Sequence, residues 1–344
     1  MLWHMCRNHF IKFLNLGGNN MCTAITFHAK QHYFGRNMDY EHSYHETVTI
    51  TPRNYSFSFR KCQEIKSHYA MIGMAYVVDD YPLYYDATNE KGLSMAGLNF
   101  PDNAVYQDCQ KEGDNITPFE LIPWILGQCA NIKEVKLLLK RLRIVSIPFS
   151  EELPLTPLHW LIADKQTAIT LETNEQGIQV YDNEPGVLTN NPPFPMQLFQ
   201  LNQYMNLSNQ PAVNQFSQKL NLKPYSRGMG GIGLPGDLSS TSRFVKACFV
   251  KANSVCEETQ MSSVSQFFHI LGAVEQQRGC VDVGNGQYEM TIYSSCCDVD
   301  QGIYYYTTYE NAQINAVDMY KEDLDGSHLI SYKLKLSQNI FQVN

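Results

Sequence analysis

Alternation of apolar and polar positions dominates the first hundred residues. Residues 22–29 (CTAITFHA) alternate small and apolar side chains, and residues 33–40 (YFGRNMDY) follow after a short polar break. Period-two alternation is typical of β-strands, so this pair predicts a hairpin. The same signal predicts further strands at 46–53 and 55–60. The longer apolar run at 69–78 predicts a strand that is buried on both faces, and residues 84–100 predict two strands joined by a turn at Asn89-Glu90-Lys91-Gly92.

Helical spacing replaces this alternation in the middle of the chain. A helix is expected over 116–129, where a Thr-Pro pair makes a good start, and a second is expected over 131–142, with Asn131 as its cap. The apolar positions on one face of the second helix are Val135, Leu138 and Leu142.

Strand and helix patterns then alternate in blocks. The strands expected in these blocks are 158–164, 167–173 and 178–183, and later 303–310, 314–319 and 328–334. Between them, after a glycine-rich loop at 226–237, two helices are expected, the first at 242–252 and the second with Val264, Phe267, Phe268, Leu271 and Val274 at helical spacing. Such an order predicts two sheets flanked by helices. No linker or repeat divides the chain, so one domain is expected over 22–344.

Composition excludes several classes of protein. The chain has 344 residues, of which 44% are hydrophobic and 17% charged, and its net charge is -8. No lysine- or arginine-rich block is present, so we expect no nucleic-acid partner. No run of about 18 apolar residues occurs, so no membrane span is expected. The 10 cysteines are scattered without zinc-ligand spacing, which favours a reduced, cytoplasmic protein without a metal site.

The first 21 residues lack the features of a secretory signal. Lys12 and Asn15 interrupt the longest apolar run, and no small-residue cleavage site follows. We interpret residues 1–21 as an upstream mis-start or a leader that is removed. The glycine pair ahead of Met21 is compatible with a translated ribosome-binding sequence.

The candidate chemistry lies at Met21-Cys22, at the head of the first predicted strand. No phosphate-binding loop, G-x-S-x-G motif or H-E-x-x-H motif is present, and no cysteine–histidine dyad is evident, although such partners need only be close in space. Removing the residues before Cys22 exposes an α-amine with a pKa of about 7.7–8.0, which is a usable base near neutral pH. Nucleophile and base would then belong to one residue. The alternative is that Cys22 is a small buried hydrophobe.

Two charged residues on the neighbouring strand favour the catalytic interpretation. Arg36 and Asp39 lie in the FGRNMD segment, which the predicted hairpin brings within reach of Cys22. A guanidinium lowers the pKa of a thiol, and a carboxylate orients an amine. The alternative is an ion pair on the surface, which is common and nearly neutral in energy.

Separated motifs along the chain resemble the choloylglycine hydrolase family, which contains bile salt hydrolases and penicillin V acylases. They are MCTAITF, FGRNMD, NEKGLSMAGLNFP, LHWLIAD, GVLTNNP, GLPGDLSSTSRF and YYTTYENAQINAV. Together they span nearly everything from Cys22 to the carboxyl end. The resemblance implies a four-layer αββα sandwich of the N-terminal nucleophile type, an α+β fold, assembled as a homotetramer and needing no cofactor.

The resemblance also assigns roles to residues. It implies that Cys22 is the nucleophile, that Arg36 and Asp39 lie beside it, and that Arg243 in TSRF is the second arginine of the site. It implies further that Asn99 in AGLNF and Asn190 in LTNNP bind the oxyanion and orient the substrate amide. Turn-forming roles for both asparagines, and a helix-surface role for Arg243, are the alternatives.

The substrate expected from this resemblance is a conjugated bile salt. Asparagine at the Asn99 position is typical of the bile salt hydrolases, whereas the penicillin V acylases carry tyrosine there. By the same resemblance, Met38, Val78, Phe149 and Leu153 line an apolar groove for the steroid, although each also suits ordinary core packing. Glycine conjugates are favoured over taurine conjugates. A penicillin V or other N-acyl amide hydrolase is the rival enzyme, and a noncatalytic binding protein that keeps its leader is the rival of another class.

Overall fold

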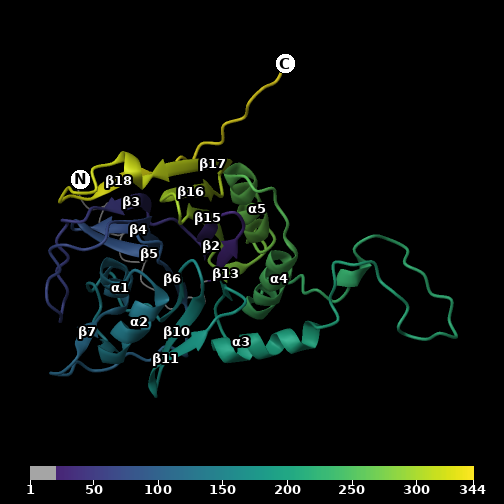
Figure 1. The fold of residues 1–344 in the computed structure, drawn as a ribbon, viewed down its shortest axis with the longest axis horizontal. Coiled ribbons are helices and arrows are strands. Elements are labelled where there is room, and N and C mark those ends of the chain that lie inside the picture. The colour runs from purple at the N-terminus through teal and green to yellow at the C-terminus, as the bar shows by residue number, and fades with distance from the viewer. Residues whose placement is uncertain (1–20) are drawn as a thin grey trace, which may run out of the picture.

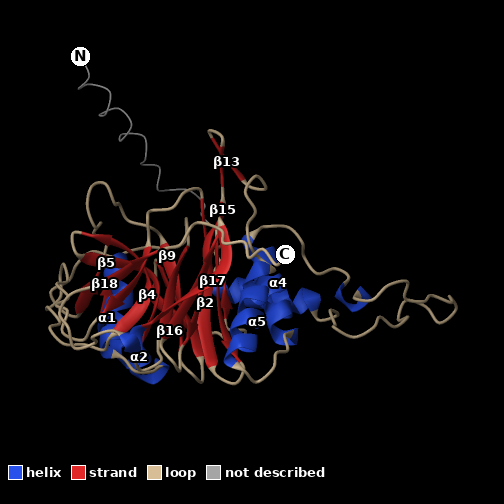
Figure 2. Cartoon of the chain, turned by 90° about the horizontal axis from the view of Figure 1, so that it is seen from above, coloured by secondary structure: helices blue, strands red, loops and turns tan. Residues whose placement is uncertain are grey.

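Two antiparallel sheets packed face to face form the centre of the molecule, with helices on the outer side of each (Figures 1 and 2). The computed structural model describes residues 21–344. The interpretation of residues 1–21 as a leader therefore falls outside the described part, apart from Met21. The order of layers is helix, sheet, sheet, helix, so the predicted αββα sandwich is confirmed.

The first sheet contains the nucleophile candidate. Its six strands, in spatial order, are β12 (Val187–Leu188), β1 (Cys22–His28), β2 (His32–Tyr40), β15 (Met290–Asp298), β16 (Ile303–Thr308) and β17 (Asn311–Asp318). The hairpin register pairs Cys22 with Met38 and Ala24 with Arg36. Paired residues of an antiparallel ladder share a face, so Cys22, Arg36 and Met38 point the same way.

The second sheet supplies the opposite wall. Its eight strands, in spatial order, are β11 (Gly177–Asp182), β10 (Ala168–Asn174), β9 (Leu158–Ala163), β6 (Ser94–Asn99), β5 (Tyr81–Asn89), β4 (Met71–Val78), β3 (Thr47–Thr51) and β18 (Ile330–Lys333). Two small ladders lie outside both sheets: β7 (Asp114–Ile116) with β8 (Leu142–Ile144), and β13 (Asp282–Gly284) with β14 (Gln287–Tyr288).

The helices cover the sheets because each presents one apolar face. Helix α1 (Leu121–Gln128) packs on β5 and β6, and α2 (Ile132–Leu138) follows on the same outer layer. Helices α4 (Ser240–Asn253) and α5 (Gln260–Gly272) pack on β1, β2 and β15 of the first sheet. Helix α3 (Phe194–Gln200) leads into a long arm, which projects away from the sandwich before α4 begins (Figure 1). None of the helices within residues 21–344 is long and apolar enough to cross a membrane.

Some predicted elements were wrong, for identifiable reasons. Residues 55–60 alternate in burial as expected, but only Phe57 makes a strand-like bridge, with Ile65. Their aromatic side chains enter the core while their backbone stays outside the ladder. The second helix stops at Leu138, and Leu142 begins strand β8 instead of continuing its apolar face. The elements that were not predicted include α3, the short strands β7, β12, β13 and β14, and the central strand β15, whose run of small, polar and aromatic residues is buried on both faces.

The packing of α5 yields a stability prediction. Phe267 is fully buried between this helix and the first sheet, whereas its neighbour Phe268 is only half-buried. Truncating a fully buried phenylalanine removes apolar contact and leaves a cavity, so Phe267→Ala should lower the free energy of unfolding by about 3–5 kcal/mol. Phe268→Ala should lower it clearly less. Urea denaturation of both variants checks this expectation, and equal losses would contradict it.

Candidate active site

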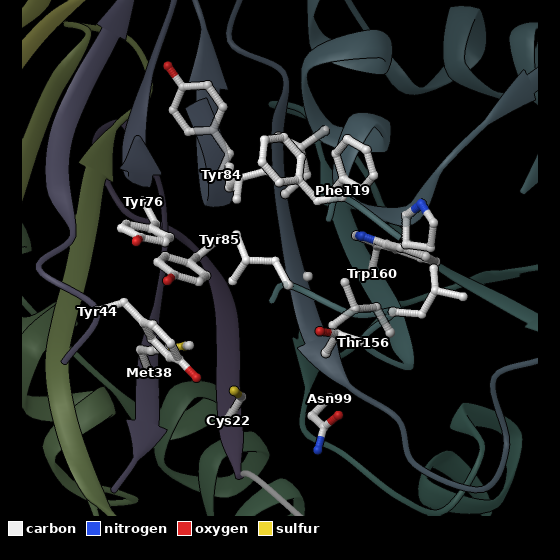
Figure 3. Close-up of a pocket in the computed structure, with 18 of the residues that line it drawn as sticks. Cys22, Met38, Tyr44, Tyr76, Tyr84, Tyr85, Asn99, Phe119, Thr156 and Trp160 are labelled. Atoms are coloured by element: carbon white, nitrogen blue, oxygen red, sulfur yellow. The ribbon is translucent and has the colours of Figure 1, made fainter. Parts of the chain in front are cut away.

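Cys22 lies at the first position of β1, on the face that looks toward the second sheet. Its side chain is only 3% exposed. It borders a cavity of about 190 Å³ between the two sheets, together with Arg36, Met38 and Asn99. Figure 3 shows the sulfur of Cys22 directed into this cavity, with the amide of Asn99 across from it. The cavity therefore brings residues of the separated segments MCTAITF, FGRNMD and AGLNF to one place.

Arg36 connects the thiol to the second sheet. Its Nη2 lies 2.6 Å from the Sγ of Cys22, and its Nη1 donates to the carbonyl oxygens of Tyr85, at 3.1 Å, and Gly97. These carbonyls belong to β5 and β6, while Arg36 belongs to β2. The side chain is 1% exposed, so it is not part of a surface ion pair. A buried guanidinium against sulfur stabilises the thiolate more strongly than it would in water.

The net effect on the thiol differs from the sequence-based expectation. Burial raises the pKa of the Cys22 thiol, and the guanidinium of Arg36 lowers it by a smaller amount. Arg36 thus acts in the predicted direction, but desolvation of the sulfur outweighs it. The net shift therefore favours the thiol over the thiolate.

Asn190 and Arg243 hold the backbone of Cys22 from the helix side. The backbone N–H of Cys22 donates to Oδ1 of Asn190 at 2.8 Å, and the same oxygen accepts from Nη2 of Arg243 at 2.7 Å. Nη1 of Arg243 donates to the carbonyl oxygen of Cys22 at 2.5 Å and to Oγ1 of Thr23 at 2.6 Å. Arg243 is 1% exposed at the start of α4, which excludes a helix-surface role.

Asp39 lies on the opposite face of β2 from Arg36. It is fully buried, and its Oδ1 accepts from Oγ1 of Thr291 at 2.6 Å. Its Oδ2 has no hydrogen-bond partner among the described residues. Burial raises the pKa of this carboxyl to about 6, although Arg243 and the bond from Thr291 oppose the shift. The unpartnered oxygen leaves room for one more donor.

Asn99 and Asn190 belong to one hydrogen-bonded unit. Nδ2 of Asn190 donates to the backbone oxygen of Asn99 at 2.8 Å. Asn190 lies just beyond β12, and Asn99 ends β6, so the contact joins the two sheets beside Cys22. Asn99 itself lines the cavity, and Asn190 lies behind it, between Asn99 and the backbone N–H of Cys22.

The apolar part of the cavity contains most of the predicted groove. Met38, Phe149 and Leu153 line it, together with Tyr44, Tyr76, Tyr84, Phe119, Ile122 and Trp160. Val78 does not line it; this residue is half-buried at the far end of β4. Tyr76, two residues earlier on the same face of β4, does line the cavity, so Val78 lies one side-chain step beyond it.

Three residues near the site were missed. Glu289 accepts a hydrogen bond from the backbone N–H of Met21, and Thr291 binds Asp39. Both adjoin the start of β15, which carried no recognisable strand signal. Asp86 on β5 accepts from the hydroxyls of Tyr293, at 2.9 Å, and Tyr304, at 2.7 Å, between the sheets. The only sequence signal for this residue was that an aspartate stands within a predicted strand of mostly apolar residues. Burial raises the pKa of Asp86, and Arg36 lowers it.

Comparison with known proteins agrees with this arrangement. Residues 22–332 match the family described as linear amide C–N hydrolases, choloylglycine hydrolase family. A bile salt hydrolase/transferase of Lactiplantibacillus plantarum is 58% identical over 94% of this chain and 100% of its own length. One of Clostridium perfringens, with the same description, is 39% identical with the same coverages. The chain belongs to the choloylglycine hydrolase family.

Solved structures support the membership. A conjugated bile acid hydrolase from Clostridium perfringens superposes with a TM-score of 0.86 at 38% identity, covering 94% of this chain and 100% of that one. A penicillin V acylase from Agrobacterium tumefaciens superposes with a TM-score of 0.69 at 18% identity, covering 90% of each chain, which shows a shared fold. This choloylglycine hydrolase family member is therefore a linear amide C–N hydrolase with the N-terminal nucleophile fold.

Asp39 yields a pH-dependent stability prediction for the chain that still carries Met21 in front of Cys22, which is the state that the structure describes. The pKa of its carboxyl rises from 3.8 to about 6 on folding, so folding takes up a proton between these values. Stability should fall as pH rises through this window, and the ionised carboxylate should remain destabilising at pH 7.5. Asp39→Asn removes the titrating group, so the variant should melt higher by roughly 2–6 °C at pH 7.5 and show little difference at pH 4. Thermal unfolding followed by circular dichroism measures both.

The control is Glu152→Gln, which removes one carboxylate from an exposed position. The melting temperature of this variant should differ between pH 4 and pH 7.5 by about as much as that of the parent protein. A gain for Asp39→Asn of the same size at both pH values would refute the assignment of the effect to a buried charge.

Proposed function

We propose that this protein hydrolyses the amide bond of glycine- or taurine-conjugated bile salts, releasing free bile acid and the amino acid. The observation that carries the proposal is a buried thiol at the polar end of an otherwise apolar cavity. Tyrosine, phenylalanine, isoleucine and leucine side chains dominate the lining, as a rigid steroid requires. The relatives named above are bile salt hydrolases, and the residues that surround Cys22 come from the motifs that this chain shares with the family.

Cys22 is the nucleophile in this proposal, and its own α-amine is the base. Loss of residues 1–21 would turn the backbone N–H that now donates to Asn190 into a free amine at the same place. The unpartnered Oδ2 of Asp39 is a suitable acceptor for one of the additional protons. Glu289, which now binds the N–H of Met21, would lose that partner and be released toward the same group.

The reaction proceeds in two stages. The α-amine takes the proton of the Cys22 thiol, and the sulfur attacks the amide carbonyl carbon. The C–N bond then breaks as the α-ammonium gives its proton to the departing nitrogen, leaving a thioester. In the second stage the α-amine takes a proton from water, whose oxygen attacks the thioester carbon. The bile acid leaves, and the thiol recovers its proton. The thiol pKa, raised by burial, explains why the internal base is required.

The oxyanion that forms at each attack is stabilised by the amide groups of Asn99 and Asn190. The contact between these two residues keeps them at a fixed separation from the sulfur. Removing one such donor typically raises the barrier by about 2.7–4 kcal/mol. Met38, Phe149 and Leu153 hold the steroid in this proposal, whereas Val78 lies outside the lining and supports the end of β4.

A direct assay tests the proposal. Protein whose mature mass shows Cys22 at the amino terminus should release glycine from glycocholate, with slower release of taurine from taurocholate. Cys22→Ala should reduce turnover by at least about 10³-fold, because it removes the nucleophile. Chromatography of free cholate, with intact-protein mass spectrometry of the same sample, provides both measurements.

Phenoxymethylpenicillin is the matched alternative substrate. Faster hydrolysis of it than of glycocholate would make the protein a penicillin V or other N-acyl amide acylase. Full turnover of glycocholate by protein that retains residues 1–21, or by Cys22→Ala, would contradict the role of the liberated amine and sulfur.

We further propose a cytoplasmic homotetramer. The nine cysteines within the described residues are all free thiols, which suits a reducing compartment. Family resemblance favours the tetramer, and the arm between α3 and α4 gives it a physical reason (Figure 1). This arm, defined as residues 205–237, exposes an unusual set of apolar side chains for a protein in water. They are Met205, Val213, Phe216, Leu220, Leu222, Tyr225 and Ile232.

Light scattering during size-exclusion chromatography checks the assembly. The mass measured for the parent should be four times that of the protomer. The double variant Phe216→Asp, Tyr225→Asp should give smaller species. Each of these two side chains is 84% exposed in the protomer and would be buried in the assembly, where a charge is unfavourable. Ile340→Asp, at an 82% exposed position of the carboxyl tail, is the control and should remain a tetramer. An unchanged mass for the double variant would exclude the arm as the interface.

A further inference from the structure

The indole N–H of Trp160 is a buried donor without an acceptor. Trp160 lies on β9, its side chain is 0% exposed, and it borders the cavity that Cys22 also borders. Its Nε1 has no hydrogen-bond partner among the described residues. A buried N–H in that condition is rare in folded proteins, because nothing replaces the water that it loses.

The orientation of the ring turns this donor toward the cavity. Figure 3 shows the nitrogen of Trp160 at the edge of the indole that faces the space between Tyr84, Tyr85 and Phe119. Trp160 is paired with Gly97 across the ladder between β9 and β6. A Cβ at Gly97 would lie 3.1 Å from Nε1, so the absence of a side chain there keeps the edge of the ring uncovered by a methyl group.

The position of Trp160 separates it from the bond that is cleaved. The register pairs Leu158 with Asn99 and Trp160 with Gly97, so Trp160 lies one side-chain step farther from the end of β6 that carries Asn99. The scissile carbonyl must lie against Cys22 and Asn99. An oxygen that reaches Trp160 therefore belongs to the acyl part of the substrate, away from the amide.

We propose that Nε1 of Trp160 donates a hydrogen bond to a hydroxyl oxygen on the ring system of the bound acyl group, and that Trp160 thereby selects hydroxylated bile salts. This inference rests on the proposed function. A site that buries a donor discriminates against the analogue lacking its acceptor, because the donor is then left unpaired in the complex. Tyrosine and threonine hydroxyls also belong to the lining, but a hydroxyl rotates and can donate or accept, whereas the indole N–H is a donor only and has a fixed direction.

The test uses glycine conjugates that differ only in their ring hydroxyls. The substrates are the conjugates of cholic, deoxycholic, chenodeoxycholic and lithocholic acids, and of the cholanic acid that has no hydroxyl. Trp160→Phe should lower kcat/KM about 3- to 10-fold for those substrates that present the recognised hydroxyl, mainly through KM. For conjugates that lack this hydroxyl, kcat/KM should change by less than about twofold, once any loss that is common to all substrates has been divided out.

An isosteric replacement separates the N–H from the bulk of the ring. Site-directed incorporation of benzothienylalanine at position 160 keeps the bicyclic shape and exchanges the N–H for sulfur. It should reproduce the loss of selectivity without the packing change of Trp160→Phe. Thermal unfolding of each variant shows that the protein remains folded during the assays.

Tyr84 provides the matched control. Its ring also lines the cavity, but its hydroxyl bonds Oγ1 of Thr51 at 2.7 Å and points away from the cavity in Figure 3. Tyr84→Phe should therefore lower stability and leave the ranking of substrates unchanged.

The outcomes separate this inference from the proposed function. If no conjugate is hydrolysed by the parent protein, the proposed function fails. If all are hydrolysed and the variants at position 160 lose the same factor on every one, including the conjugate without a hydroxyl, Trp160 is a packing residue and the inference is overturned. A factor that depends on one ring hydroxyl supports it and identifies the position that is recognised.

Discussion

The guanidinium of Arg36 is the interaction on which the rest of the structure depends. It leaves β2 of one sheet, donates to carbonyl oxygens of β5 and β6 in the other, and ends against the sulfur of Cys22. A buried cation must be compensated on every side, and here the compensation comes from both sheets at once. The same side chain therefore bears on both the spacing of the sheets and the position of the Cys22 sulfur. Asp86 lies between the same sheets and accepts hydrogen bonds from two tyrosine hydroxyls.

Two buried carboxyls near Cys22 carry a cost in stability, which the proposed free amino terminus would offset. Asp39 and Glu289 are both buried carboxyls whose pKa values burial raises, to about 6 and about 7. Neither has a complete set of partners from side chains, since one oxygen of Asp39 is unbound and Glu289 binds the backbone N–H of Met21. Such an arrangement weakens a folded protein in isolation. In the proposed mature protein, a positive α-ammonium at Cys22 would compensate the charge of these two carboxylates and reduce the cost of burying them.

Recognition and chemistry occupy opposite ends of one cavity. The end near Cys22 and Asn99 is rich in amide groups and charge, whereas the remainder is built of aromatic and aliphatic side chains from the second sheet and the 148–158 segment. A steroid amide has the same polarity along its length. Tyrosine hydroxyls also line this part, but the indole N–H of Trp160 is a fixed donor without a partner among the described residues, and this is the reason for assigning Trp160 a role in selection.

Local pattern was sufficient for the layers of this fold, because period-two and helical spacing report which face of each element is buried. Short motifs were sufficient to predict that Cys22, Arg36 and Asn99 come together, which the cavity confirms, whereas the role of Cys22 as nucleophile stays a prediction. Local pattern was insufficient for β15, whose side chains are buried on both faces and show no alternation. It also placed Arg36 and Asp39 together, although they lie on opposite faces of one strand. The net pKa of the thiol, the unpaired oxygen of Asp39 and the unpaired N–H of Trp160 arise from how residues distant in the chain exclude water around them, and desolvation is a property of packed neighbours that no spacing along a chain records.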